Sequence, residues 1–396
     1  MNKAEQNARS VKTITGIVLS SITLYSFSYS IITVMINEVV NGFSLSGVSE
    51  GMMSSMFSLG SMVALLAAPL IQGRVAKMTV LISATALQAL MLMFCGLSPV
   101  FVLFCVSCSF LGVGGGLADA YSNSLLVDVH REKSTRYLGY LHGLFGVGSL
   151  LAPLLILLGL GLVGWQGVFL MLATVLLIGV AILSMIVKRS HRTDMKQVAR
   201  EKVVNPADLL EYVKNPRNIA VIATAVCITA SQTGVLVWVS RYMALRFEAE
   251  AMGAVSISLF WICATINRFT VTRAQLAPAR LFAVGAIMGA LFLGAGIFSN
   301  SALGMCIAMG GVGLCTGHFM PLLFSECTRG FEGRTTFATS VLLVAVGVIR
   351  SVMPLVMAFI AAAVSMVASM LLPAFTLVGV AACGLLLARI GRRCGS

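Results

Sequence analysis

Charged side chains are scarce in this chain: Asp, Glu, Lys and Arg make up 10% of its 396 residues, against 58% hydrophobic residues. A water-soluble protein could not hide that much apolar surface in one core, so lipid must be the solvent. No nucleophile arrangement or metal-ligand spacing is visible, and the glycine run Gly112–Gly116 is not followed by the Lys-Ser/Thr of a phosphate loop. Most of the ten cysteines lie inside apolar stretches, as small buried hydrophobes do. We therefore expect no enzyme, no bound cofactor and no disulfide framework.

Long apolar stretches are what the sequence has instead. A membrane-spanning helix needs about 20 such residues, and polar or Gly/Pro punctuation cuts the chain into about twelve stretches of that kind. They lie near 13–38, 48–72, 78–97, 100–127, 136–161, 164–187, 217–245, 251–273, 280–299, 301–326, 335–362 and 366–390. The pattern predicts an all-α membrane protein with twelve transmembrane helices in two pseudo-symmetric six-helix bundles.

One long hydrophilic segment divides these stretches into six and six. It predicts an N-terminal bundle at 1–187, a cytoplasmic linker at 188–216 and a C-terminal bundle at 217–396. Within the linker, Asn205-Pro206 and Asn215-Pro216 bracket a short interfacial helix. We expect the first apolar stretch to remain as an uncleaved span, because it is too long for a secretory signal.

Basic residues collect in every second loop. The clusters are Lys3, Arg9 and Lys12; Arg74 and Lys77; Arg131, Lys133 and Arg136; Lys188 to Arg217; Arg273 and Arg280; Arg329 and Arg334; and Arg389, Arg392 and Arg393. Cytoplasmic loops of membrane proteins carry such an excess, so both termini are predicted to be cytoplasmic in a multi-pass protein of the plasma (cytoplasmic) membrane. The net charge of +13 then reflects orientation and attraction to anionic lipid, and we expect no nucleic-acid partner.

Short internal repeats support the division into halves. Gly112-Val113-Gly114 matches Gly311-Val312-Gly313 at a separation of 199 residues, which aligns Asp119 with His318. Gly146-Val147-Gly148 likewise matches Gly347-Val348 at about 201. Two repeated halves with a substrate site between them near the membrane midplane is the architecture that such a duplication predicts.

Several motifs occur in a recognisable order. They are Asn37-Glu38 followed by Phe43–Ser46; Gly112–Asn123; His142–Gly148 with Pro153; Trp238 with Tyr242; and Phe260-Trp261 with Arg268. With the six-plus-six organisation and the basic linker, the chain resembles the major facilitator superfamily, and within it the fucose permease-like branch. The resemblance implies the major facilitator fold and a carrier that imports sugars with protons. We expect the protein to be a monomer.

The chain also departs from its relatives' patterns. The loop after the second span keeps a degenerate form of the superfamily motif, with Gln72 where an Asp is usual. Cys108 stands where drug/proton antiporters generally carry an arginine, which argues against a drug exporter. Gln232 replaces an acid that the branch often has in its seventh span, so the ligand contacts of this chain could differ from those of a neutral-sugar permease.

Ionisable groups inside apolar spans are the main functional clue, because each costs about 2.5 kcal/mol or more unless it is paired or hydrated. Asp119 lies about eight residues, roughly 12 Å, from the cytoplasmic end of the fourth span, and the resemblance places the branch's acid there. It is our first candidate for proton coupling. His142 enters the fifth span at a similar depth, where it could relay the proton from Asp119 or be a satisfied buried histidine. His318 could bind substrate or serve packing.

Glu38 marks the outer end of the first span, where the resemblance implies a second functional acid. It is a proton-coupling candidate, although a glutamate at a helix mouth could also be hydrated and dispensable. The repeat carries Glu38 to within about one residue of Arg241. We expect these two residues to form an extracellular gate pair.

Arg350 lies near the middle of the eleventh span, where a charge is costly. A guanidinium offers a fork of donors that suits a carboxylate. We therefore expect an anionic ligand, such as a sugar acid, unless the arginine is used internally in a salt bridge to Asp119 or Glu38.

The remaining candidates divide into gates and ligand contacts. At the cytoplasmic helix ends, Arg74 with Asp128 and Arg268 with Glu326 are predicted to be latches. Hydroxyl or ring contacts to the substrate are predicted for Asn37, Asn123, Gln232, Trp238 and Tyr242, which could equally serve packing.

Together these features predict a secondary transporter that works by alternating access, with the proton as coupling ion and a small polar solute as substrate. The alternatives that remain open are efflux or exchange of an organic anion, and a membrane sensor with the same fold that transports nothing.

Overall fold

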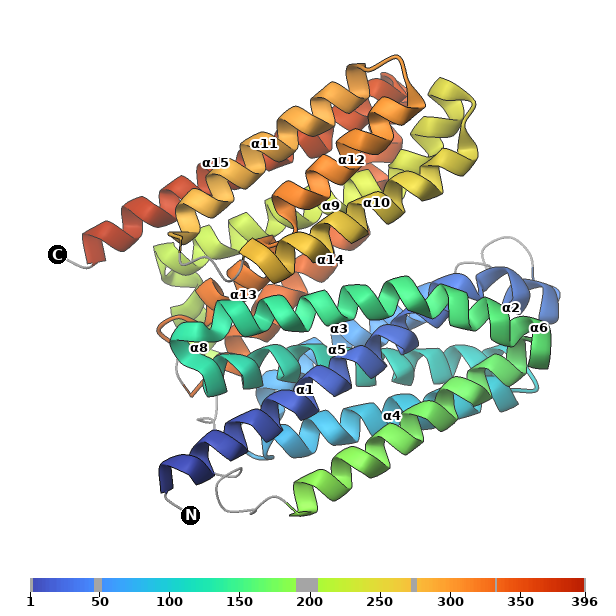
Figure 1. Cartoon of the computed structure of the whole chain (residues 1–396), viewed down its shortest axis with the longest axis vertical. Helices are drawn as coiled ribbons and strands as arrows, with labels where there is room; N and C mark the ends of the chain where they lie inside the picture. The colour runs from blue at the N-terminus through green and yellow to red at the C-terminus, as the bar shows by residue number, and fades with distance from the viewer. Residues whose placement is uncertain (1–2, 46–51, 190–205, 272–275, 332, 395–396) are drawn as a thin grey trace. The chain divides into compact units, whose positions relative to one another are not determined.

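A computed structural model describes residues 3–45, 52–189, 206–271, 276–331 and 333–394, and these residues are almost entirely helical. They form two compact units (Figure 1). The first unit comprises Met1–Tyr137, Leu144–Val204 and Gly330–Val341; the second comprises Leu138–Gly143, Asn205–Arg329 and Leu342–Ser396. Each unit thus includes one short segment from the other half of the sequence.

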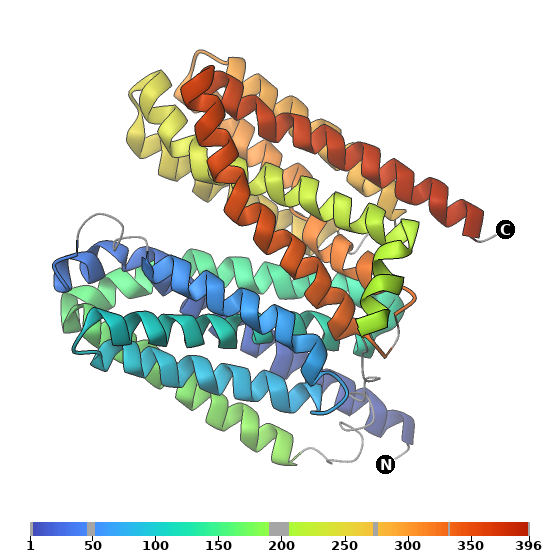
Figure 2. The same ribbon diagram turned by 180° about the vertical axis from the view of Figure 1, so that it is seen from behind.

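Within each unit, the helices form membrane spans that alternate in direction along the chain (Figures 1 and 2). Up to the linker they are α1 (Lys3–Val34), α2 (Ile36–Gly42), α3 (Met52–Ile71), α4 (Lys77–Leu97), α5 (Phe101–His130), the short η2 (Arg131–Lys133) and α6 (Ser134–Arg189). Beyond it they are α8 (Pro206–Lys214), α9 (Pro216–Phe247), α10 (Glu250–Thr270), α11 (Pro278–Phe298), α12 (Ala302–Thr316), α13 (Phe319–Thr328), α14 (Thr335–Ala363) and α15 (Met366–Cys394).

The helices account for twelve membrane spans. Nine helical stretches among the described residues are long and apolar enough to cross a membrane, and two shorter apolar helices lie at Ser55–Ile71 and Val255–Thr270. One of the nine, Phe101–Ala152, covers both α5 and the start of α6, which brings the spans to twelve. The predicted all-α fold with two six-helix bundles is therefore confirmed.

α6 provides two of these spans because it is broken in the middle. At Gly164 the backbone takes φ 69°, a left-handed conformation that a residue without a Cβ adopts at little cost. The 56 residues of α6 therefore form two antiparallel arms (Figure 1).

Close packing of α3 on α5 depends on two glycines one turn apart. A Cβ atom at Gly112 would overlap the carbonyl oxygen of Phe57, and one at Gly116 would lie 2.6 Å from the carbonyl oxygen of Ser61. Small residues four positions apart let two membrane helices approach until their backbones touch, and dispersion contacts then hold them together.

The same arrangement recurs between α10 and α12 in the second unit. A Cβ atom at Gly313 would overlap the carbonyl oxygen of Phe260, and one at Gly317 would overlap the carbonyl oxygen of Ala264. The second unit therefore repeats the contact that joins the second and fourth spans of the first.

These contacts also set the register of the repeat. Gly112 and Gly116 correspond to Gly313 and Gly317 at a separation of 201 residues, two more than the 199 obtained by matching the Gly-Val-Gly strings. His318 is thus not the structural counterpart of Asp119. The alignment of the two halves by identical Gly-Val-Gly strings was therefore off by two residues. The glycines that correspond in the two halves are those that contact the backbone of a neighbouring helix.

The short helix predicted within the linker is present as α8. It ends at Lys214, and the Asn215 side chain then caps α9 by accepting a hydrogen bond from the backbone N–H of Arg217 at 2.9 Å. Tyr212 of α8 is fully buried, and burial raises the pKa of its phenol. Its hydroxyl lies 3.5 Å from the carbonyl oxygen of Cys327, and its own carbonyl accepts a hydrogen bond from Asn218 at 3.1 Å.

Candidate functional site

α9 carries three buried polar atoms that have no hydrogen-bond partner among the described residues. They are Oγ1 of Thr229, Nε2 of Gln232 and Nε1 of Trp238. Leaving such an atom unsatisfied costs about 1–3 kcal/mol, so water or a bound molecule is expected to supply partners. Gln232 and Trp238 are two of the ligand contacts predicted from the sequence, whereas Thr229 was missed. The signal that could have identified Thr229 is its position one helical turn before Gln232, on the same side of the span.

Two other predicted ligand contacts use their polar atoms within the protein. The hydroxyl of Tyr242 donates to the carbonyl oxygen of Ile297 at 2.8 Å. The ring nitrogens of His318 lie 2.9 Å from the side-chain oxygen of Asn267 and 3.3 Å from the carbonyl oxygen of Leu281. Both side chains are buried, and these contacts favour a structural role for them.

Asp119 and Asn123 lie one turn apart on α5 and form one polar group. Nδ2 of Asn123 donates at 2.8 Å both to Oδ1 of Asp119 and to the backbone carbonyl of Asp119. Asn123 is fully buried and Asp119 partly buried. The amide orients the carboxylate within a transmembrane helix, so Asn123 positions the candidate proton carrier.

Arg350 lies on the side of α14 that is otherwise buried. It is four residues after Val346 and three before Met353, which are 2% and 6% exposed. The lipid-facing stripe of α14 is a different one, formed by exposed side chains that recur every three or four residues. Its members are Val348, Val352, Val356 and Phe359. Arg350 is nevertheless exposed, although its neighbours Val346 and Met353 on that side of the helix are buried.

The level of Arg350 can be related to α9 through a glycine. A Cβ atom at Gly234 would lie 2.7 Å from the sulfur of Met357 and 3.2 Å from the terminal methyl of Met353. α9 and α14 are the seventh and eleventh of twelve alternating spans, so they run in the same direction. Arg350 therefore lies about one turn before Gly234, close to the level of Gln232.

Asp128 is held by a lysine that the sequence did not single out. Nζ of Lys77 lies 2.6 Å from Oδ2 of Asp128 and 2.6 Å from Oγ1 of Thr335, which itself donates to Oδ1 of Asp128 at 2.9 Å. Lys77 is 1% exposed, whereas Arg74, the predicted partner, is exposed in the preceding turn. The latch predicted between Arg74 and Asp128 is thus made by Lys77, because Lys77 starts α4 on its buried side.

Further hydroxyl groups extend this cluster along α14. Thr336 donates to Oγ of Ser124 at 3.0 Å, and Thr339 lies 3.5 Å from the carbonyl oxygen of Ala120. Thr336 and Thr339 are fully buried. The start of α14 is therefore tied to α5 by polar contacts that can be exchanged for water, unlike a packed apolar interface.

Replacing Lys77 with methionine should strongly destabilise the first unit. Asp128 would keep its partly buried position without its cation, and breaking a buried ion pair from one side costs up to about 3–5 kcal/mol. Thermal unfolding in detergent measures the effect. Arg74→Met removes an exposed cation nearby and should change stability by less than about 0.5 kcal/mol. Equal effects of the two substitutions would contradict the assignment of the ion pair.

The second predicted latch, between Arg268 and Glu326, also has different partners. Glu326 pairs with Arg217 at 2.8 Å and lies 3.8 Å from Arg329. Arg268 is 4% exposed and donates to the carbonyl oxygens of Gly317 at 3.0 Å and His142 at 3.1 Å. The rotation of α10 about its axis buries the Arg268 guanidinium among carbonyl groups. Glu326 pairs instead with Arg217, which lies at the start of α9, next to the linker.

The other candidates are more dispersed. Glu38 lies in the first turn of α2 and is partly buried, and Arg241 is exposed on α9. Asn37 is in α2, but its side chain is outside the described residues. The ring of His142 stacks on Phe324, with centroids 5.3 Å apart. His142 belongs to the second unit and Asp119 to the first, so the predicted relay between them stays a prediction, as does the gate pair of Glu38 and Arg241.

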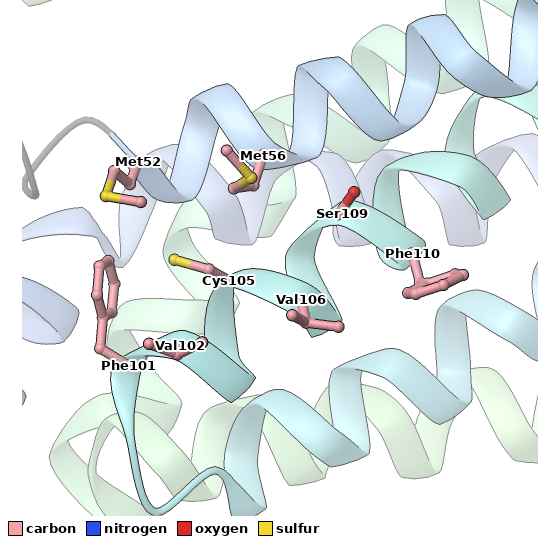
Figure 3. A pocket seen from close by; sticks show the side chains of 8 residues that line it. All are labelled: Met52, Met56, Phe101, Val102, Cys105, Val106, Ser109 and Phe110. Carbon is pink, nitrogen blue, oxygen red and sulfur yellow. The ribbon is translucent and has the colours of Figure 1, made fainter.

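A crevice between α3 and α5 does not suit a polar solute. Its volume is about 410 Å³, and Figure 3 shows the side chains around it. They are Met52, Met56, Phe101, Val102, Cys105, Val106, Ser109 and Phe110. The lining is almost wholly apolar and carries no charge, and Val102, Val106 and Phe110 are exposed large hydrophobic residues. Such a surface matches lipid, so we place the candidate polar site elsewhere.

Known proteins resemble the chain over most of its length. A family model described as Major Facilitator Superfamily matches residues 18–276. The crystal structure of a transporter of that superfamily, FucP, in the outward conformation has 17% identity and a TM-score of 0.76, over 94% of this chain and 98% of that chain. The crystal structure of a variant of the E. coli fucose:proton symporter FucP has 17% identity and a TM-score of 0.74, over 94% of this chain and 98% of that chain.

The human organic anion transporter MFSD10 (TETRAN) has 13% identity and a TM-score of 0.70, over 95% of this chain and 99% of that chain. At these identities the solved structures show a shared fold and leave the substrate open. A comparison with curated protein sequences found no match.

Proposed function

The chain belongs to the major facilitator superfamily and is a multi-pass membrane transporter, and from that premise we propose that it takes up a small polar solute together with a proton. The solute is a sugar, a sugar acid or a related organic anion. The transporter works as a monomer by alternating access, with the proton as its only coupling ion, and both termini face the cytoplasm.

The observation that carries the proposal is the set of unsatisfied polar atoms on α9. Thr229, Gln232 and Trp238 each bury an oxygen or nitrogen without a partner among the described residues. An amide and a hydroxyl can satisfy solute hydroxyl groups, and an indole gives a sugar ring both a flat apolar face and an N–H donor. Within a membrane span such atoms need a partner, and a bound polar molecule can supply one.

Coupling to protons rests on Asp119. It is a carboxylic acid within a transmembrane helix, held in place by Asn123. Such a group can take up a proton on one side of the membrane and release it on the other when access alternates. The fold shared with a fucose:proton symporter is consistent with this role.

Gating is the proposed role of the charged clusters at the helix ends. The contacts of Lys77, Asp128 and Thr335 involve ionic and hydroxyl groups, which water can replace when the helices separate. The groups around Arg268 and Glu326 supply a similar set in the second unit.

Uptake into proteoliposomes tests the proposal. L-Fucose and D-glucuronate serve as matched probes, one neutral and one anionic. With the outside about one pH unit more acidic, symport of one proton should concentrate at least one probe about tenfold inside, since a tenfold ratio corresponds to about 1.4 kcal/mol. Accumulation that requires preloaded solute would indicate exchange, and no flux of either probe under any gradient would overturn the proposal for these classes of solute.

A further inference from the structure

Arg350 lies deep within a span of the second unit, where acidic side chains are scarce. Between residues 217 and 396 the sequence has four acids: Glu248, Glu250 and Glu326 lie at or near helix ends, and Glu332, between α13 and α14 in the sequence, is outside the described residues. The interiors of the last six spans therefore offer Arg350 no carboxylate. Among the described residues Arg350 also takes part in no ion pair.

Arg268 shows how a buried arginine of this protein can be satisfied by groups of the protein itself. Its guanidinium contacts two carbonyl oxygens, and its Cζ lies 5.5 Å from the centre of the Trp261 ring. Arg350, in contrast, is exposed on the inner side of α14, about 20 Å of helix from either end of the span. A permanent cation at that depth needs water or an anion beside it.

We propose that Arg350 binds the carboxylate of a monoanionic solute, and that the solute enters with one proton so that each transport cycle carries no net charge. This inference rests on the proposed function. The planar fork of a guanidinium donates two parallel hydrogen bonds to a carboxylate, a match that no single hydroxyl of a neutral sugar provides. Thr229 and Gln232, close to the same level on α9, then contact the polar remainder of the solute.

The charge balance follows from the two ions that move. The solute carries one negative charge and the proton one positive charge, so together they cross without charge. A membrane potential does work only on net charge. The potential should therefore not drive uptake of this solute, whereas a pH gradient should.

Binding to purified protein tests the role of Arg350. A thermal-shift series compares D-glucuronate with D-glucose, D-gluconate with D-glucitol, and lactate with 1,2-propanediol. We expect only carboxylates to stabilise the protein. Arg350→Gln should weaken their binding about 10- to 100-fold, because a hydrogen bond to a charged group is lost. Arg350→Lys keeps the charge but not the fork, so it should fall in between.

Arg389→Gln is the matched control, since it removes the same charge from an exposed position near the end of α15 and should leave binding unchanged. Binding of neutral members alone, binding of no carboxylate, or carboxylate binding that survives Arg350→Gln would overturn the assignment. The last result is expected if Arg350 serves an internal salt bridge.

Potential-driven uptake separates this inference from the proposed function. With valinomycin and about a tenfold potassium gradient, inside negative, a neutral solute that enters with one proton should accumulate about tenfold more, whereas a monoanion should be unaffected. Proton-driven uptake of a neutral probe would support the proposed function and refute the anion. Carboxylate binding without any flux would support the role of Arg350 in binding an anion and refute the proposed transport.

Discussion

Asp119→Asn is expected to abolish proton-driven accumulation while leaving solute exchange intact. The amide has the shape of the protonated acid but cannot release a proton, so the carrier loses its coupling and keeps its binding site. Under a gradient of about one pH unit, the ratio of inside to outside solute should fall from about tenfold to one. Uptake into proteoliposomes measures this ratio, and counterflow into vesicles preloaded with unlabelled solute measures exchange.

The matched control is Asp128→Asn, because Asp128 lies on the same helix but is paired with Lys77. Because Asp128 belongs to the proposed gate, the change should lower stability and slow transport, but the folded protein should still concentrate solute under a pH gradient. An Asp119→Asn variant that still concentrates solute under a pH gradient would remove Asp119 from the coupling mechanism. Loss of exchange along with accumulation would instead make Asp119 a ligand contact.

The fold could be predicted because membrane spans obey a simple rule. Each must be apolar over about 20 residues, and the hydropathy of the chain shows twelve such stretches without any knowledge of packing. The start of α9 at Pro216 and the short helix α8 were also readable, since Asn-Pro pairs mark helix starts. Even the break in α6 fits the boundary between the fifth and sixth predicted spans.

Pairing of charges was harder to predict. Arg74 and Lys77 are three residues apart at one helix start, and the sequence does not say which of them turns toward Asp128. That choice depends on the rotation of α4 against α5. Glu326 and Arg268 pose the same problem, because each has several oppositely charged or polar groups within reach of its long side chain.

The roles of polar residues inside the spans could be predicted only in part. Composition marks Gln232, Trp238, Tyr242 and His318 equally, yet two of them find partners within the protein and two retain a buried donor that has no partner in the described part of the chain. The partners of Tyr242 and His318 are largely on other helices, so only packing in three dimensions distinguishes the two groups. Arg350 could be identified by depth alone, because few charges lie so far from a helix end.

Substitutions at the repeated glycine contacts should destabilise both units. Gly112→Ala and Gly313→Ala place a Cβ atom where the carbonyl oxygens of Phe57 and Phe260 already lie, so α3 and α12 must move away from their partners. Overpacking of this kind costs about 1–3 kcal/mol. Because the two contacts are equivalent, we expect similar losses in the two units.

A thiol-reactive fluorogenic dye can follow the unfolding of these variants in detergent, because free cysteines such as Cys95 and Cys108 are buried until the helices separate. Gly16→Ala and Gly294→Ala are the controls. Apart from the adjoining residues and backbone of its own helix, nothing lies within 4 Å of a Cβ built at either position, so alanine should be neutral there or should stabilise the helix by up to about 1 kcal/mol. If Gly112→Ala unfolded no earlier than Gly16→Ala, the backbone contact between α3 and α5 would not be what holds them together. If only one of the two units were weakened, the symmetry of the contacts would not extend to their energies.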